Sequence, residues 1–292
     1  MNTSYEPFSM EPVYIEANRG FVQRGPFHEI KRFLDLACGT GTVSELLLER
    51  VPAAHLTGVD LDSIQIELSA ERFRNQRYLV RSGFELSDER VDGKPVLNFA
   101  TGSADELPFP DACFDCVTMA NAIHLVSDRK RLLDGVSRVL SPCGVFGFNT
   151  TFYAGAMPEG TQRIYVDWLR LASDYIKDKS RQLEARGMPP IKRVHGTTRG
   201  AFKNRWYNKE EWTACLADSG LEVVDVHERE VVLDAHSLAL VGAYGGLAEV
   251  LLSGFPVAEA SEGLQASAAQ ALFDSKCSTI ARNYLEIWAR SL

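Results

Sequence analysis

Two acids and two glycines follow the first apolar segments of the chain at the points where a ligand would need them. Asp35 closes an apolar run, and Gly39 and Gly41 come before the helical pattern that follows. Glycines let a backbone approach a ligand with no Cβ in the way, and the first N–H groups of a helix favour negative charge. Asp60 closes the next apolar run, where a carboxylate can accept hydrogen bonds from both hydroxyls of a ribose. The spacing predicts a site for an adenosine-containing ligand.

A dinucleotide is the first candidate for that ligand. Its fingerprint is G-x-G-x-x-G. Gly39 and Gly41 fit the first two positions, but Ser44 occupies the third. The pattern therefore favours a different adenosine ligand.

Strand-like and helix-like segments alternate from about residue 32, and they must position these residues. Apolar runs predict strands at 32–36, 55–59, 96–101, 114–119 and 145–149, and helical spacing predicts helices at 42–50, 63–75 and 128–140. This alternation is typical of a parallel sheet with helices on both faces. Ligands of such sheets bind beyond the carboxyl ends of the strands, which is where the acids and glycines stand.

The second half of the chain has a different pattern. It predicts a long helix or helix pair at 160–186, a helix that starts at Asn208, a strand at 222–233, and helical stretches near 237–252 and 264–277. Residues 283–292 alternate in the manner of a strand. We therefore expect the chain to finish inside the sheet, and Ser141–Gly144 to form a turn before the fifth strand.

Three motifs together resemble one enzyme family. They are DLACGTG at 35–41, GVDLD at 58–62 and GSADELPF at 102–109. This series resembles the class I S-adenosylmethionine-dependent methyltransferases, above all the ubiquinone/menaquinone-biosynthesis and natural-product small-molecule branch. Residues 30–150 carry the resemblance, and 282–290 is similar to the family's final antiparallel strand. The resemblance implies a Rossmann-like α/β fold: a seven-stranded, mostly parallel sheet with helices on both faces, an antiparallel last strand and a helical lid.

The same resemblance assigns the cofactor contacts. Asp35 and the following backbone would hold the methionine end, Asp60 the ribose and Leu61 the adenine ring. Ser103 stands where the family usually has Asp, so either its hydroxyl or Asp105 would meet the adenine amine. The full set of predicted S-adenosylmethionine contacts is Asp35, Ala37, Cys38, Gly39, Gly41, Asp60, Leu61, Ser103, Ala104, Asp105, Ala120 and Asn121.

The acceptor side is predicted from residue type and position. His124 follows the fourth strand and is the candidate base for removing a proton from an acceptor. Within one domain, 1–292, three segments are expected to cover the site: an N-terminal cap at 1–29, a lid insertion at 152–206 and additional helices at 235–280. Their aromatic side chains predict a mainly apolar pocket, with Tyr14, Phe21, Tyr153, Trp168, Trp206 and Tyr244 as its candidate lining.

Composition and charge limit the partners. The 292 residues carry a net charge of −8, which argues against a general nucleic-acid binder. No export signal or membrane-length apolar run is visible, and the six cysteines are scattered, so we expect a reduced, cytoplasmic protein without a metal centre. Residues 177–205 hold nine Lys or Arg and two acids. This basic segment predicts either a solvated loop or contact with an anionic substrate or carrier.

These observations predict an enzyme that methylates a small, mostly apolar acceptor. O-methylation in secondary metabolism leads, with C- and N-methylation close behind. Two alternatives share the fold: a protein that binds the cofactor without catalysis, and a cyclase that retains the cofactor.

Overall fold

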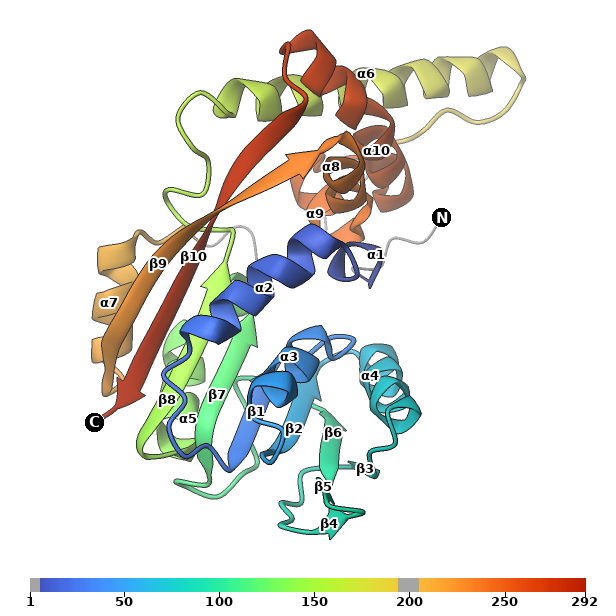
Figure 1. Ribbon diagram of the computed structural model, residues 1–292. Helices are drawn as coiled ribbons and strands as arrows, with labels where there is room; N and C mark the ends of the chain where they lie inside the picture. Colours follow the sequence, from blue (N-terminus) through green and yellow to red (C-terminus); the bar gives the residue numbers. More distant parts are fainter. Residues whose placement is uncertain (1–5, 194–204) are drawn as a thin grey trace. The chain divides into compact units, whose positions relative to one another are not determined.

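The computed structural model describes residues 6–193 and 205–292, and its central feature is a twisted sheet (Figure 1). Eight strands in the described ranges form this sheet in the order β3-β6-β2-β1-β7-β8-β10-β9. Their bounds are β1 Arg32–Leu36, β2 His55–Asp60, β3 Val80–Ser82, β6 Leu97–Thr101, β7 Phe114–Ala120, β8 Leu140–Thr150, β9 Leu221–Asp234 and β10 Thr279–Ser291.

The pairing confirms the predicted mostly parallel sheet. β1 runs parallel to β2 and β7, and β7 runs parallel to β8. β10 pairs antiparallel with β8, as expected for the last strand. The structure adds β3, a three-residue edge strand parallel to β6, and a small hairpin of β4 (Arg90–Val91) and β5 (Lys94–Pro95). These strands are too short to produce a readable alternation in the sequence.

One predicted turn belongs to a strand. Residues 141–144 lie within β8, where Phe114 pairs with Leu140 but Cys116 pairs with Val145. The extra residues form an irregularity in which Cys143 has a φ of 63°. The prediction of a separate turn was therefore wrong. A Pro-Cys-Gly sequence also suits a strand bulge, which needs the same unusual backbone angles.

Helices connect the parallel strands and bury one face each. α3 (Thr42–Arg50), α4 (Ser63–Asn75) and α5 (Arg129–Val139) lie between successive strands. Asp62 and Asp128 cap α4 and α5, because their carboxylates accept the N–H groups of Ile64 and Arg131. The core between these helices and the sheet is aliphatic and aromatic, and each such side chain that is fully buried contributes about 1.5–3 kcal/mol. Its members include Phe33, Leu47, Phe73, Phe99 and Trp288.

The chain divides into two compact units. The sheet unit comprises Ile15–Ala154, Asn204–Arg229 and Tyr284–Leu292, and the helical unit comprises Met1–Tyr14, Gly155–Lys203 and Glu230–Asn283. Most of the predicted lid insertion and nearly all of the predicted additional helices thus fall in the helical unit. No helix within the described ranges has both the length and the apolarity needed to cross a membrane.

Long helices build the helical unit. α6 (Gln162–Ala185) is a single helix and packs on α10 (Val257–Asp274). The indole Nε1 of Trp168 on α6 donates to the backbone oxygen of Leu264 at 2.8 Å. The stretch predicted at 237–252 is two helices, α8 (Ala235–Ala243) and α9 (Gly245–Leu251), and α1 (Glu6–Ser9) completes the unit. α10 begins seven residues before its predicted start, since Pro256 caps it.

Two further helices belong mainly to the sheet unit. α2 (Pro12–Arg24) was not predicted as a helix, whereas α7 (Lys209–Ala217) was. Asn208 caps α7 as expected, in a capping box with Glu211.

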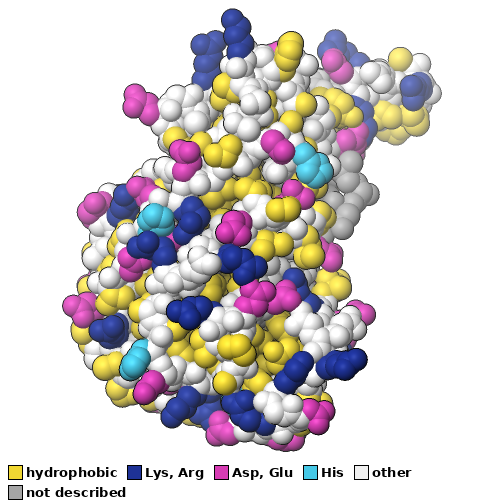
Figure 2. Space-filling model, viewed as in Figure 1, with side chains coloured by type: hydrophobic (Ala, Val, Ile, Leu, Met, Phe, Trp, Pro, Cys, Tyr) yellow, Lys and Arg dark blue, Asp and Glu magenta, His cyan; other side chains and the backbone are white. Residues whose placement is uncertain are grey.

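On the face seen in Figure 2, basic and acidic side chains are interspersed, so no broad field of one sign covers that face.

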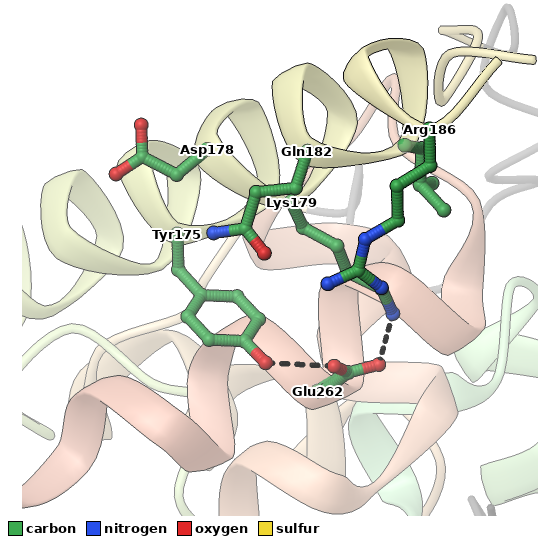
Figure 3. A pocket seen from close by; sticks show the side chains of 7 residues that line it. Tyr175, Asp178, Lys179, Gln182, Arg186 and Glu262 are labelled. Atoms are coloured by element: carbon green, nitrogen blue, oxygen red, sulfur yellow. Dashed lines mark hydrogen bonds and ion pairs between the residues drawn. The ribbon is translucent and has the colours of Figure 1, made fainter. Parts of the chain in front are cut away.

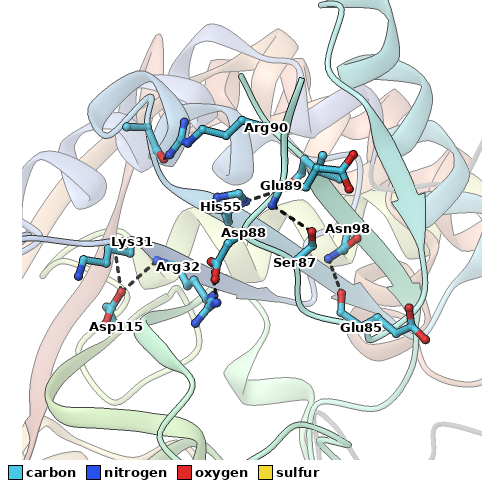
Figure 4. A network of polar contacts seen from close by, with 12 residues as sticks. Lys31, Arg32, His55, Glu85, Ser87, Asp88, Glu89, Arg90, Asn98 and Asp115 are labelled. Atoms are coloured by element: carbon cyan, nitrogen blue, oxygen red, sulfur yellow. Dashed lines mark hydrogen bonds and ion pairs between the residues drawn. The ribbon is translucent and has the colours of Figure 1, made fainter. Parts of the chain in front are cut away.

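A polar network closes the amino ends of the strands, away from the predicted site (Figure 4). The Asp115 carboxylate accepts the backbone N–H groups of Lys31 and Arg32 at 2.8 and 3.0 Å. The Arg32 guanidinium pairs with Asp88 at 2.6 Å, and the Asn98 amide donates to the Glu85 backbone oxygen at 2.7 Å. These contacts give partners to backbone N–H groups at the start of β1 and to the Glu85 backbone oxygen.

Candidate functional site

The turn between β1 and α3 has an open side. Ala37, Gly39 and Gly41 all have left-handed backbone angles, with φ of 53°, 53° and 80°. A Cβ on Gly41 would lie 3.0 Å from the Phe73 ring, so packing explains that glycine. A Cβ on Gly39 would meet nothing within 4 Å. The backbone at Gly39 therefore faces space that a ligand can enter.

Neighbouring elements hold this turn in place. The Gly39 N–H donates to Asp60 Oδ2 at 2.9 Å, and the Ser69 hydroxyl on α4 donates to the Gly39 backbone oxygen at 2.6 Å. The Arg72 guanidinium donates to the backbone oxygen of Thr40 at 3.2 Å. Sequence reasoning missed Ser69 and Arg72, because their spacing on α4 resembles that of any polar helix face. The turn is thus shaped before any ligand arrives.

Asp60 sits where the turn and the next strand meet. Its second carboxylate oxygen accepts the Asp62 N–H at 2.9 Å, and its backbone oxygen accepts the N–H of Gly102 at 2.9 Å. A carboxylate has about four acceptor sites, so two remain for ribose hydroxyls. Leu61 beside it leaves 73% of its surface exposed. An acceptor group and an open apolar side chain therefore lie side by side, as a nucleoside would need.

Ser103 and Asp105 form a pair in the structure. The Ser103 hydroxyl donates to the Asp105 carboxylate. The hydroxyl oxygen keeps its lone pairs, so it can still accept from an amine. Both residues, and Ala104 between them, are partly exposed. The pair can together present the acceptor that the usual Asp of the family would provide.

Asp35 lies beneath the turn and is 1% exposed. Its carboxylate accepts the hydroxyls of Ser44 at 2.6 Å and Thr118 at 3.0 Å, and so ties β1 to α3 and β7. Burial raises the pKa of Asp35 from 3.8 to about 6, and the nearby Asp60 charge adds to the rise, while the two hydroxyl hydrogen bonds oppose it. Cys38 follows Asp35 in the turn and is also buried. The role of Asp35 toward the methionine end stays a prediction.

The carboxyl end of β8 organises the predicted reaction side. Ala120 ends β7, and Asn121 follows with a φ of 49°. His124 lies on the short 3₁₀ helix η1 (Ile123–Leu125) and is buried. Its Nδ1 is 3.2 Å from the Thr150 hydroxyl, and its ring stacks on Phe152 with centroids 4.1 Å apart.

One predicted acceptor residue lies with His124. The Trp206 ring meets Phe152 edge-on, with centroids 5.7 Å apart. Phe152, which sequence reasoning missed, therefore joins His124 and Trp206 into one aromatic group. Aromatic rings in this arrangement can bind a flat apolar molecule at their edges.

The other predicted lining residues lie in packed surroundings. Phe21 is fully buried and stacks on Trp288 at 4.8 Å, and Tyr153 is buried with its hydroxyl donating to Glu228 at 2.6 Å. Both belong to the sheet unit. In the helical unit Tyr14 and Trp168 are buried and Tyr244 is partly exposed between α8 and α9. Their contact with an acceptor stays a prediction.

A groove of about 430 Å³ opens between α6 and α10 in the helical unit (Figure 3). Glu262 accepts the Tyr175 hydroxyl at 2.7 Å and pairs with Lys179. The Lys179 hydrogen bond holds the pKa of Glu262 below its usual range. The groove is polar and its charges neutralise each other, so it does not suit an apolar acceptor.

Three basic side chains in the described part of the basic segment, 177–193, pair with acids, and one of them is Lys179. Lys177 lies 2.9 Å from Asp174, and Arg181 pairs with Asp178. Residues 194–204 of this segment lie outside the described residues. Contact with an anionic partner therefore stays a prediction. Among the residues that the structure describes, no three His, Cys, Asp or Glu side chains gather as a metal site would need.

Comparison with known proteins identifies the sheet unit's motif-bearing part. Residues 34–148 match the family described as a methyltransferase domain. This segment is therefore similar to a methyltransferase domain. Over 114 residues it is 32% identical to demethylmenaquinone methyltransferase of Thermotoga maritima, covering 39% of this chain and 41% of the relative. The phthiotriol/phenolphthiotriol dimycocerosates methyltransferase of Mycobacterium tuberculosis is 32% identical over 118 residues, covering 40% of this chain and 37% of the relative.

The whole chain resembles solved structures in fold. The cyclase SpnF aligns with a TM-score of 0.53 at 18% identity, covering 95% of this chain and 81% of that chain. The chain spans about two fifths of the length of these curated relatives. The matched residues thus include the three sequence motifs, while the helical unit lies outside them.

Proposed function

We propose that this protein transfers a methyl group from S-adenosylmethionine to a small, mostly apolar acceptor, with O-methylation as the leading reaction. The observation that carries the proposal is the open backbone at Gly39 beside the Asp60 carboxylate and the exposed Leu61. This cofactor needs three contacts. Its methionine end needs an open, ordered turn, its ribose needs a group that accepts hydrogen bonds from hydroxyls, and its adenine needs an apolar surface. The names of the relatives, which act on quinones and lipids, support an apolar acceptor.

The cofactor would supply a methyl group on a positively charged sulfur, and the residues of the chain would bind and orient it. The Gly39 turn would hold the methionine end, Asp60 would accept from the ribose, and the Ser103–Asp105 pair would accept from the adenine amine. Alignment of the acceptor with the methyl group accounts for most of the rate gain available to such a site.

His124 removes the acceptor proton in this proposal. Its contact with Thr150 bears on which ring nitrogen carries the hydrogen. If Nδ1 carries the hydrogen and donates to the Thr150 hydroxyl, then Nε2 is the ring nitrogen without a hydrogen and can accept a proton. The Thr150 oxygen already accepts the Phe152 N–H at 3.0 Å and has a second lone pair for this bond. The contact thus fits a tautomer with a basic Nε2.

The test is transfer of a radiolabelled methyl group to a panel of naphthoquinols, phenols, enols, carboxylates and amines. We expect label in an apolar hydroxyl acceptor. Label only in an amine or at carbon would favour the second candidate, N- or C-methylation. Tight cofactor binding with no label in any acceptor would contradict methyl transfer and support the non-catalytic or cyclase alternative.

Two glycine substitutions test whether the open backbone at Gly39 contacts the cofactor. Gly39→Ala places a methyl group in the open space before the turn, so cofactor affinity should fall at least ~10-fold, and the strained backbone should cost about 1 kcal/mol of stability. Gly93→Ala is the matched control, because Gly93 has a φ of 79° and equally open surroundings in the β4–β5 hairpin. Calorimetry that finds equal cofactor affinity in both variants would remove Gly39 from the site.

A further inference from the structure

Three asparagines, two of them buried, form a chain of hydrogen bonds from α2 to the end of β7. The Asn121 N–H donates to Asn149 Oδ1 at 2.7 Å and also to the Asn149 backbone oxygen at 3.0 Å. Asn149 Nδ2 in turn donates to Asn18 Oδ1 at 2.9 Å. Asn18 and Asn149 are both 0% exposed. Polar groups buried this deeply cost stability unless they are hydrogen-bonded, so their placement requires an explanation.

The hydrogen bonds fix the direction of this chain. A backbone N–H can only donate, so Asn149 must turn its oxygen toward Asn121. Its amide nitrogen then faces Asn18, which must present an acceptor. Asn121 itself needs this support, because its φ of 49° lies in the left-handed region that non-glycine residues adopt at a cost. The arrangement therefore sets a specific requirement at Asn18: an acceptor atom.

α2 has other anchors on the sheet unit, so Asn18 is not needed to dock the helix. Phe21 stacks on Trp288, and Arg24 forms two hydrogen bonds with Asp225 at 2.9 and 2.6 Å. A Cβ on Gly20 would lie 2.3 Å from the guanidinium carbon of Arg229, which places the helix backbone close to that side chain. Arg229 is itself paired with the fully buried Glu286.

The residues after Asn149 hold the other end of the same loop. Thr150 contacts His124 Nδ1, Phe152 stacks on the His124 ring, and the Thr151 hydroxyl donates to Asn121 Oδ1 at 3.4 Å. Residues 149–152 thus contact both ends of the loop that runs from Asn121 to His124. Asn18 orients the side chain of Asn149, the first of these residues.

We propose that Asn18 is a positioning residue for methyl transfer. Through Asn149 it holds the backbone of Asn121, and with it the loop that carries His124. The effect on turnover rests on the proposed function, whereas the effect on the Asn121 backbone does not. Asn18 lies outside the segment that matches the methyltransferase domain, which is residues 34–148.

The experiment compares three variants of the full chain by amide hydrogen exchange, cofactor calorimetry and methyl-transfer kinetics. Asn18→Leu removes the acceptor at similar volume. Asn18→Asp keeps an acceptor oxygen. Arg24→Gln is the control, because it removes an anchor of α2 that does not touch Asn149.

In Asn18→Leu we expect exchange at the Asn121 N–H to rise at least ~10-fold and turnover to fall at least ~10-fold, the scale of one lost buried hydrogen bond. Cofactor affinity should change less than turnover. Asn18→Asp should restore both quantities to within ~3-fold of wild type, and Arg24→Gln should leave both unchanged.

Unchanged Asn121 exchange in Asn18→Leu, or equal damage in Asn18→Asp, would overturn the proposal. If Asn18→Leu does not fold, Asn18→Ala gives the same exchange readout, and unchanged exchange there overturns it too. A wild-type protein that transfers no methyl group while Asn121 exchange still depends on Asn18 would refute the proposed function and leave the structural link standing.

Discussion

At the scale of single residues, Asp60 has two duties in the structure. It accepts the Gly39 and Asp62 N–H groups, and it has further lone pairs for the proposed ribose hydroxyls. Hydrogen bonds to a charged group contribute roughly 1.5–3 kcal/mol, so Asp60→Ala should weaken cofactor affinity at least ~10-fold. Calorimetry measures this directly, and affinity equal to that of wild type would exclude Asp60 from the site.

Asp35 makes the stability of the fold depend on pH. Its pKa is about 6 in the folded chain against an ordinary 3.8, mainly because it is buried. Between these values the folded chain holds a proton that the unfolded chain has released, so the free energy of unfolding should fall as pH rises from about 4 through about 6. The loss should approach ~3 kcal/mol and level off above that range.

Asp35→Asn isolates this effect. The hydroxyls of Ser44 and Thr118 can accept as well as donate, so an amide can replace the carboxyl group. Denaturant unfolding of both proteins from pH 4 to 8 should show a difference that changes only between pH 4 and about 6. A difference independent of pH would show that Asp35 has no such shift.

His124 makes the mechanism testable through the pH dependence of turnover. If its neutral ring removes a proton, the rate should fall on the acid side as the ring becomes protonated. His124→Ala should lower turnover by roughly 10²–10⁴, remove that acid limb and leave cofactor affinity nearly intact. His124→Gln separates base from orientation, because glutamine can hydrogen-bond the acceptor but cannot take its proton. Folded His124→Ala with near-normal turnover would end the base assignment.

At the scale of elements, the predicted lid consists mainly of α6, which packs on α10. α6 packs on α10 through the buried Trp168, and glycines allow the two helices to approach: a Cβ on Gly263 would lie 2.9 Å from the Ala172 backbone oxygen. A lid built in this way should order as one body. We predict that amide exchange over 155–185 slows when cofactor and acceptor are bound together. Exchange rates that are equal with and without both ligands would contradict a lid.

The sequence predicted elements well where one local signal decided them. Asn208 was expected to begin a helix, and it caps α7 in the structure. The helix predicted at 63–75 has those bounds in α4. α2 was not predicted because Asn18 and Gly20 interrupt the apolar residues on its buried face. Asn18 is bonded to Asn149, and Gly20 lies against Arg229. Contacts with residues far away in the chain do not produce a periodic pattern in the sequence.

At the scale of the whole molecule, some residues near the candidate site could be located from the sequence and others could not. Strand-end residues such as Asp60 and Gly39 could be placed from the motif, because topology alone brings the carboxyl ends of parallel strands together. Phe152 and Thr150 could not, since their contacts with His124 depend on side-chain packing. The aromatic lining was predicted from residue type only, and Phe21 and Trp168 proved to be fully buried.

The path of the chain between the two units has a practical meaning for anyone who engineers this protein. The helical unit is assembled from three separate stretches, and two of its borders fall inside β9 and β10. It therefore cannot be exchanged with that of another protein as a single cassette. A chimera would need three coordinated grafts with strand registers preserved, so acceptor preference should be far easier to change by point substitution around Phe152 and Trp206 than by recombination.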